Sequence, residues 1–150
     1  MTAAPPRLSA IPLATWERDG VKAALTKAGL PAEDADSATL HFWRFEMDDL
    51  TPVGFGGLEI HGEHALLRSV VTLPPLRRRG IGRGIVKALE AEAQIAGCRA
   101  IWLMTTTAAE LFGRLGYESC ERTRVPAAIR QTQQFAVLCP ASATVMTKSL

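Results

Sequence analysis

Four arginines and three glycines lie within eight residues in the middle of the chain, in a pattern that suits an anionic ligand. Residues 77–84 read Arg-Arg-Arg-Gly-Ile-Gly-Arg-Gly, between a β-favouring stretch and an amphipathic one. Glycine allows a ligand to approach the main chain closely, and the first turn of a helix offers free N–H groups and a positive dipole end. The chemistry that fits is the binding of a phosphate or pyrophosphate. The alternative is a solvated basic turn before a surface helix.

Two common phosphate-binding motifs do not fit this stretch. No Gly-Lys-Ser/Thr follows the glycines, as a Walker A loop requires. The preceding strand belongs to a meander and the glycine spacing differs, so the stretch is not a Rossmann fingerprint.

The elements around the motif predict an α/β fold with a mixed, mostly antiparallel sheet and helices on its faces. Strands are expected at 7–10, 39–46, 53–61, 65–73, 100–105, 117–122 and 143–149, and helices at 13–28, 80–97, 107–115 and 126–135. Short turns join three consecutive strands into an antiparallel meander. Strand 65–73, helix 80–97 and strand 100–105 form a crossover unit, so these two strands should run parallel.

Composition is that of an ordinary globular domain. The 150 residues are 47% hydrophobic and 21% charged, and 17 basic against 15 acidic residues give a net charge of +2. This balance argues against a nucleic-acid partner, and no stretch approaches the ~18 apolar residues of a membrane span. The N-terminus has no apolar signal region. We expect a single domain over residues 1–150, with residues 1–6 as a loose tail, in the cytoplasm and without a membrane partner.

The motif and its surroundings resemble the GNAT superfamily of N-acetyltransferases. The family signature Arg/Gln-x-x-Gly-x-Gly/Ala is matched from Arg77 to Gly82, and the strand ending at Leu73 stands at the family's distance before it. Residues 109–117 look like the family's short helix and following strand. The resemblance covers residues 7–149. It implies acetyl-CoA as co-substrate, a splayed parallel strand pair, and direct attack of an amine on the thioester in a ternary complex.

The resemblance also implies where acetyl-CoA binds. Main-chain groups of the strand would pair with the pantetheine arm like an added strand, and main-chain N–H groups of the motif would hold the pyrophosphate. The thioester would lie between strands 65–73 and 100–105. The residues expected to bind acetyl-CoA are Val70, Val71, Thr72, Arg77, Arg78, Arg79, Gly80, Ile81, Gly82 and Arg83. For Val70 and Val71 the alternative is a plain core strand, and their side chains are expected in the core.

The chain departs from the family pattern at two places. Phe112 stands where many members carry a tyrosine that acts as general acid, and Thr105 to Thr107 stand where many have an asparagine. Tyr117, the only tyrosine, is expected to pack in the core. Protonation of the leaving thiolate would then fall to water or a threonine.

Acetyl transfer needs a neutral amine, so a base must remove a proton, often through water. The candidates are histidines and carboxylates on the central strands, namely Glu46, Glu59, His41 and His64. Of these, Glu59 and His41 lie in strand interiors, where they could face the cleft. The alternative for each is a solvent-facing strand residue.

Two arginines on strands, Arg44 and Arg68, suit the acidic group of a substrate, because a guanidinium binds carboxylates in a bidentate way. By alternation, Arg68 shares a face with Leu66, Val70 and Thr72. The alternative for Arg68 is an ion pair with Glu59 on the neighbouring strand.

The C-terminal part, mainly residues 126–148, resembles a subgroup found with arsenic-resistance operons. That resemblance implies an amino-acid-like acceptor carrying a phosphinate or arsenical group. The three cysteines, Cys98, Cys120 and Cys139, form neither a disulfide framework nor a metal-binding spacing, and no metal is expected. Cys98 and Cys120 are expected as small buried hydrophobes, while for Cys139 a structural role and arsenic(III) binding both stay open.

Three other functions remain open: a catalytically silent acyl-CoA sensor, a protein or peptide N-acetyltransferase, and a thiol-based arsenic-binding protein. Phe112 in the tyrosine position favours the sensor. An open edge strand at the C-terminus would allow a homodimer.

Overall fold

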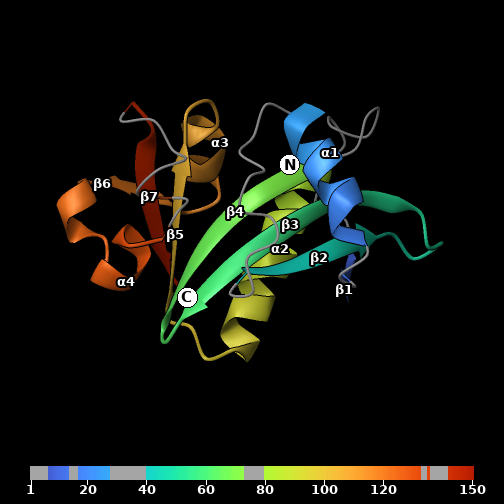
Figure 1. Ribbon diagram of the computed structural model, residues 1–150, viewed down its shortest axis with the longest axis horizontal. Coiled ribbons are helices and arrows are strands. Elements are labelled where there is room, and N and C mark those ends of the chain that lie inside the picture. The colour runs from blue at the N-terminus through green and yellow to red at the C-terminus, as the bar shows by residue number, and fades with distance from the viewer. Residues whose placement is uncertain (1–6, 14–16, 28–39, 73–79, 133–134, 136–141) are drawn as a thin grey trace.

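One mixed sheet, covered by helices on both faces, organises the protein (Figure 1). The computed structural model describes residues 7–13, 17–27, 40–72, 80–132, 135 and 142–150. Within them the sheet has seven strands in the order β1-β2-β3-β4-β5-β7-β6. The strands are β1 (Ser9–Pro12), β2 (Leu40–Glu46), β3 (Pro52–His61), β4 (His64–Thr72), β5 (Ala100–Thr105), β6 (Glu118–Cys120) and β7 (Thr144–Ser149), and the α-helices are α1 (Arg18–Lys27), α2 (Ile81–Ile95), α3 (Ala109–Arg114) and α4 (Ala127–Arg130).

The strand directions are those that the sequence predicts. β4 and β5 run parallel, and the other neighbouring strands run antiparallel. The predicted fold class, a mostly antiparallel sheet with one parallel pair and flanking helices, is therefore confirmed.

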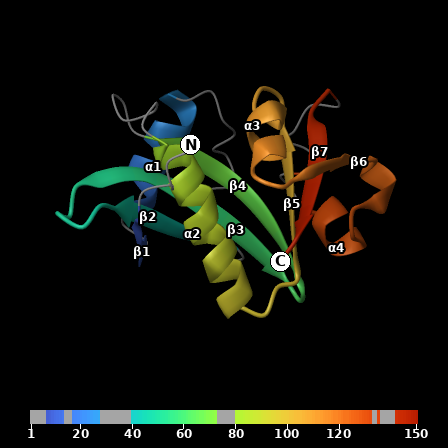
Figure 2. The ribbon, with the colours of Figure 1, turned by 180° about the vertical axis from the view of Figure 1, so that it is seen from behind.

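Each face of the sheet has its own core. On one face, called the α2 face, α2 and α3 pack against side chains such as Leu58 and Leu67. On the other, called the α1 face, α1 packs near Leu40 and α4 packs near Leu66. Leu40 and Leu66 are the register partners of Glu59, so all three lie on the same face. Figure 2, seen from behind, accordingly has α2 in front of the sheet.

Helix α2 lies close on β3 because two residues there have no side chain. A Cβ on Gly54 would stand 2.7 Å from Ile85 Cδ1 of α2, and one on Gly56 would stand 2.7 Å from Leu89 Cδ1 of the same helix. The apolar stripe of α2 is buried as its spacing predicts, through Ile81, Ile85, Leu89 and Ala93. Glycines that interrupt the strand pattern in the sequence are therefore what allows the helix to pack.

The parallel strands β4 and β5 are paired only at one end. Their partners are His64–Ala100, Ala65–Ile101 and Leu66–Trp102, although β4 continues to Thr72 and β5 to Thr105. Beyond these pairs the two strands diverge in both views (Figures 1 and 2). Main-chain groups in the second half of β4 are therefore not paired with β5.

The structure corrects three expectations about the ends of the chain. The first strand covers Ser9–Pro12 rather than 7–10, and α4 ends at Arg130 instead of continuing to 135. The C-terminal strand β7 is not an edge strand, since it lies between β5 and β6. The edge strands of the described sheet are β1 and β6.

A buried polar cluster ties α2 to β7 and to the turn after α3. The hydroxyl of Tyr117 donates to Glu90 Oε2 at 2.9 Å, and Lys148 Nζ donates to the same oxygen at 3.0 Å and to the carbonyl of Leu115 at 2.9 Å. The Tyr117 ring meets Phe112 edge to face, with centroids 5.5 Å apart. Tyr117 is thus in the core, as expected, and burial together with the charge of Glu90 raises its pKa.

This cluster predicts how the folded protein responds to alkali. Tyr117 is the only tyrosine, so phenolate absorbance reports it alone. Because folding raises its pKa, the neutral form is favoured, and stability should fall as the pH rises above about 10, where an unfolded tyrosine ionises. We expect phenolate absorbance to appear together with loss of the circular dichroism signal, and Tyr117→Phe to cost about 1–3 kcal/mol at neutral pH. A reversible titration near pH 10 in the folded protein would contradict this.

Candidate active site

The start of α2 is open to an anion. Gly80 has φ 74° and precedes the helix without a side-chain cap, and the amide of Gly84 donates to the Gly80 carbonyl at 3.1 Å. This is the first hydrogen bond of the helix, so the amides of residues 81–83 have no carbonyl partner within the helix. Only a residue without Cβ adopts this φ readily. The glycine at the helix start thus exposes N–H groups as the motif predicts.

A buried donor lies at the same place. Of the side-chain atoms that the structure describes, Arg83 Nε is buried without a hydrogen-bond partner. Such a donor costs free energy until it finds an acceptor, and a phosphate oxygen would supply one. The residues present therefore fit the pyrophosphate of acetyl-CoA.

The end of β4 lies against this helix start. A Cβ on Gly82 would be 3.5 Å from Thr72 Oγ1, an ordinary contact. Hence the end of β4 lies beside the helix start, as a pantetheine arm and its pyrophosphate require. Seven of the residues predicted to bind acetyl-CoA are described: Val70, Val71, Thr72, Gly80, Ile81, Gly82 and Arg83. The other three, Arg77, Arg78 and Arg79, lie outside the described residues.

A bulge interrupts β4 at Ser69. The register pairs Arg68 with Gly57 and Val71 with Phe55, so two residues of β4 stand opposite Gly56 alone. Ser69 has φ 62°, in the left-handed region that residues with a Cβ rarely adopt. The alternation expected from the sequence is therefore wrong beyond Arg68.

The bulge changes which side chains share a face. Val71 packs with Val21 and Leu25 on the α1 face, whereas Val70 packs against the core of the α2 face. Arg68 thus shares its face with Val71, not with Val70. The side chain of Val71 is buried and that of Val70 partly buried, as expected for core positions.

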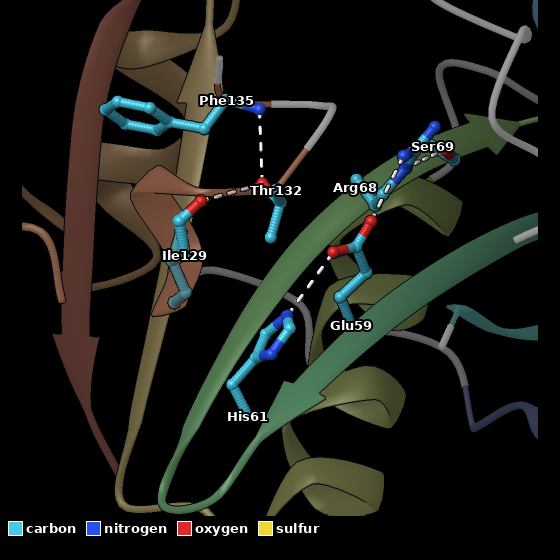
Figure 3. A network of polar contacts seen from close by, with 7 residues as sticks. All are labelled: Glu59, His61, Arg68, Ser69, Ile129, Thr132 and Phe135. Carbon is cyan, nitrogen blue, oxygen red and sulfur yellow. Dashed lines mark hydrogen bonds and ion pairs between the residues drawn. The ribbon is translucent and has the colours of Figure 1, made fainter. Parts of the chain in front are cut away.

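On the α1 face a chain of polar contacts runs along β3 and β4 (Figure 3). Arg68 Nη1 lies 3.5 Å from Glu59 Oε1, and His61 Nε2 lies 3.4 Å from Glu59 Oε2. Arg68 Nε donates to Ser69 Oγ at 2.9 Å. The side chains of Arg68 and Glu59 are 1% and 5% exposed, against 23% for His61. The network is therefore a buried ion pair with one end near solvent.

The turn after α4 lies across from this ion pair. Thr132 Oγ1 donates to the Ile129 carbonyl at 2.7 Å and accepts from the Phe135 amide at 3.2 Å, and Figure 3 draws this turn together with Glu59 and Arg68. Ile129 packs with Leu66, which precedes Arg68 on the same face. The turn after α4 therefore lies on the α1 face, on which Glu59 and Arg68 also lie.

The two candidates for the base lie on opposite faces. His41 is exposed, and its register partner Leu58 belongs to the core of the α2 face. Glu59 lies on the α1 face with Arg68. The structure thus brings Glu59 and Arg68 together and leaves His41 apart.

Arg44, the second predicted substrate contact, lies further out on β2. Its guanidinium donates to Glu46 at 2.8 Å and forms an ion pair with Glu17, before α1. The bond to Glu46 raises the pKa of Arg44. The contacts of Arg44 therefore join β2 to the approach to α1.

Sequence reasoning missed two residues of this network. His61 follows Glu59 by two residues on the same strand, and this spacing could have placed both on one face. Ser69 gave no such signal, because its role depends on the bulge.

The thiols show no reactive environment among the described residues. Cys98 is buried and Cys120 half-buried, and burial raises the pKa of both, although the charge of Arg124 opposes the shift at Cys120. Cys139 lies outside the described part. Over the same residues no cluster of three or more histidine, cysteine or acidic side chains is placed to hold a metal ion, and no helix is long and apolar enough to cross a membrane.

Solved structures share this fold at low sequence identity. N-acetylglutamate synthase from Neisseria gonorrhoeae, complexed with coenzyme A and N-acetyl-glutamate, has a TM-score of 0.76 and 14% identity over 99% of this chain and 36% of its own. Rv2747 from Mycobacterium tuberculosis, in complex with CoA and NLQ, has a TM-score of 0.71 and 22% identity over 97% and 99%. Tetrahymena GCN5 has a TM-score of 0.74 and 11% identity over 94% and 95%. This chain thus spans about a third of the Neisseria enzyme and nearly all of the other two.

The sequence itself matches a family model. No curated protein matches the chain significantly, but the model described as Acetyltransferase (GNAT) family matches residues 8–117. This range is well over half of the chain and includes the glycine motif and the crossover unit. The chain therefore belongs to the acetyltransferase (GNAT) family of acetyl-CoA-dependent N-acetyltransferases.

Proposed function

We propose that the protein transfers the acetyl group of acetyl-CoA to the amine of a small, amino-acid-like molecule by direct attack in a ternary complex. The observation that carries the proposal is the buried Glu59–Arg68 pair, which lies on the α1 face beside the divergence of β4 and β5. A buried carboxylate and guanidinium at this point offer a proton acceptor and an anion-binding group within one small site.

The donor would bind along β4 and the start of α2. Main-chain groups of Val70, Val71 and Thr72 would pair with the pantetheine arm, and the pyrophosphate would accept hydrogen bonds from the first amides of α2 and from Arg83 Nε. Arg77, Arg78 and Arg79 remain proposed phosphate contacts. Structures of three similar folds, from Neisseria gonorrhoeae, Mycobacterium tuberculosis and Thermoplasma acidophilum, contain CoA, which supports this placement.

Glu59 is the proposed base. The amine nitrogen forms a bond to the thioester carbonyl carbon, the carbon–sulfur bond breaks, and the thiolate takes a proton from water. The proton lost by the amine goes to Glu59, directly or through a water, and His61 offers a path from Glu59 to solvent. His41, on the other face, then serves as a comparison residue.

Arg68 is the proposed contact for an acidic group of the acceptor. Its buried guanidinium lies beside Glu59 on the α1 face, and a guanidinium is well shaped for a carboxylate or phosphinate. The Neisseria enzyme was solved with an acetylated amino acid, N-acetyl-glutamate, in keeping with an amino-acid-like acceptor. Arg44 is a second proposed contact, at the outer end of the α1 face. Phosphinate and arsenical amino acids are the narrower proposal, which rests on the arsenic-resistance resemblance of residues 126–148.

Location and assembly are also proposals. Cys98 and Cys120 are free thiols, as in reducing compartments, and we place the protein in the cytoplasm. A homodimer would have to use a surface other than β7.

A silent acyl-CoA sensor is the second candidate, and one observation favours it. Phe112 is buried against Tyr117, so neither residue offers an acid to the thiolate. A CoA thiolate leaves without strong assistance, however, so we prefer the enzyme.

The function is tested by thiol release from acetyl-CoA with a panel of amines. The panel contains acidic amino acids, phosphinate and arsenical amino acids, neutral amino acids and peptides. We expect turnover with the acidic or phosphinate class, because Arg68 recognises an anion. Turnover with peptides alone would overturn the acceptor assignment, and tight CoA binding without any turnover would favour the sensor.

The pyrophosphate site is tested by Gly82→Glu with Gly82→Gln as its matched control. A Cβ at Gly82 makes only an ordinary contact, so both variants should fold. The added carboxylate would repel the pyrophosphate, and we expect CoA affinity to fall about 100-fold in Gly82→Glu and much less in Gly82→Gln. Isothermal titration of CoA measures both. Equal losses of CoA affinity in the two variants would mean that side-chain bulk, and not charge, disturbs binding. Unchanged affinity in Gly82→Glu would contradict the assignment of the pyrophosphate site.

The base is tested by Glu59→Gln beside His41→Ala. We expect Glu59→Gln to lower kcat about 100-fold at neutral pH, because the acceptor amine stays protonated, and His41→Ala to leave it nearly unchanged. The deficit of Glu59→Gln should shrink as the pH rises toward the pKa of the amine, where free amine is present without a base. A deficit that is constant with pH would argue that Glu59 acts in some other way.

A further inference from the structure

We propose that Arg68 and Ser69 are positioning residues for acetyl-CoA: the Arg68 side chain holds the β4 bulge in the conformation that binds the donor. The inference rests on the proposed donor site along β4. It gives Arg68 a second role, on the donor side of the sheet, besides the acceptor contact proposed above.

The bulge is held in an unfavourable backbone conformation. Ser69 has φ 62°, and a serine there lacks the freedom that glycine would bring. The bulge separates Arg68, paired with Gly57, from Val71, paired with Phe55. Without support, Ser69 could adopt an extended conformation. The side chains of β4 would then alternate regularly, and those of the proposed pantetheine-binding stretch would exchange faces of the sheet.

The support is a hydrogen bond from the neighbouring side chain. Arg68 Nε donates to Ser69 Oγ at 2.9 Å, so the serine hydroxyl is fixed by a charged donor. The other end of the guanidinium is fixed too, because Nη1 lies 3.5 Å from Glu59 on β3. The side chain of Arg68 is 1% exposed, so water does not compete for these donors.

These contacts connect the proposed acceptor site with the proposed donor site. Glu59 and Arg68 belong to the α1 face, where the acceptor would bind, whereas Ser69 sets the course of the β4 main chain, where the donor would bind. Loss of the Arg68–Ser69 bond should therefore weaken donor binding even with no acceptor present.

Two substitutions at Ser69 separate the hydrogen bond from the backbone conformation. Ser69→Ala removes the acceptor and keeps a Cβ, so nothing holds the positive φ. Ser69→Gly also removes the acceptor, but glycine adopts a positive φ without support. We expect the Kd for CoA to rise about tenfold in Ser69→Ala and about threefold or less in Ser69→Gly. Ser119→Ala, on the exposed part of β6, serves as the control and should bind as the parent does.

A substitution at Arg68 tests the other partner. Arg68→Lys keeps a positive charge for Glu59 but has no Nε to donate to Ser69. We expect it to raise the Kd for CoA about fivefold alone, and to add little in the Ser69→Gly background, where the bulge no longer needs the bond. In turnover assays Ser69→Ala should raise KM for acetyl-CoA more than it lowers kcat.

The outcomes are distinct, with folding followed by thermal unfolding in every case. A parent protein that does not bind CoA would overturn both this inference and the proposed function. A parent that binds CoA and transfers acetyl groups, with equal losses in Ser69→Ala and Ser69→Gly, would overturn this inference alone. Lower thermal stability with unchanged Kd in both variants would also overturn it, since the bond would then support only the fold.

Discussion

The parallel pairing of β4 and β5 stops after three residue pairs, and the site depends on this early end. In a regular parallel pair the second half of β4 would spend its main-chain donors and acceptors on β5. Here the strands diverge beyond Leu66 and Trp102 while both continue. A pantetheine arm, which carries amide groups of its own, can then take the place of the missing strand neighbour. In the proposed reaction, the same divergence would give an amine on one side of the sheet a route to a thioester between the strands.

Two features of the chain maintain the divergence. The bulge at Ser69 shifts β4 by one residue against β3, and it occurs opposite Gly56, against which Leu89 of α2 packs. On the other side, β5 ends at Thr105, whose hydroxyl accepts from the Ala108 amide at 2.9 Å just before α3. Each strand is therefore held by contacts away from its partner, β4 by β3 and α2, β5 by β7 and the start of α3. Neither needs the other strand beyond the third pair, which is why the separation can be part of a stable fold.

Local patterns in the sequence were enough to predict the order and direction of the elements. The stripe from Ile81 to Ala93 predicted a helix, and the apolar run from Ala100 predicted a covered strand. Because another strand precedes this helix, the three elements together predicted a parallel crossover. Tyr117 could be placed in the core because it is the aromatic residue directly after the turn at Gly116, and aromatics in that position usually pack inside. The open helix start at Gly80 was also predictable from local sequence, because a glycine before a helix can adopt a positive φ.

Features that depend on a partner far along the chain could not be found in this way. The bulge at Ser69 is a property of two strands, and β4 alone shows a regular run that predicts Val70 on the wrong face. At the end of α4 the Thr132 hydroxyl donates to the Ile129 carbonyl and accepts from the Phe135 amide, contacts that the apolar pattern to 135 did not indicate. The face of Glu59 was undecided until its pairing with Leu40 and Leu66 was known, and that pairing is what separates it from His41. Because a buried ion pair is tolerated only when both charges arrive on one face together, the register that joins Glu59 to Arg68 is a condition of the fold as well as of the proposed chemistry.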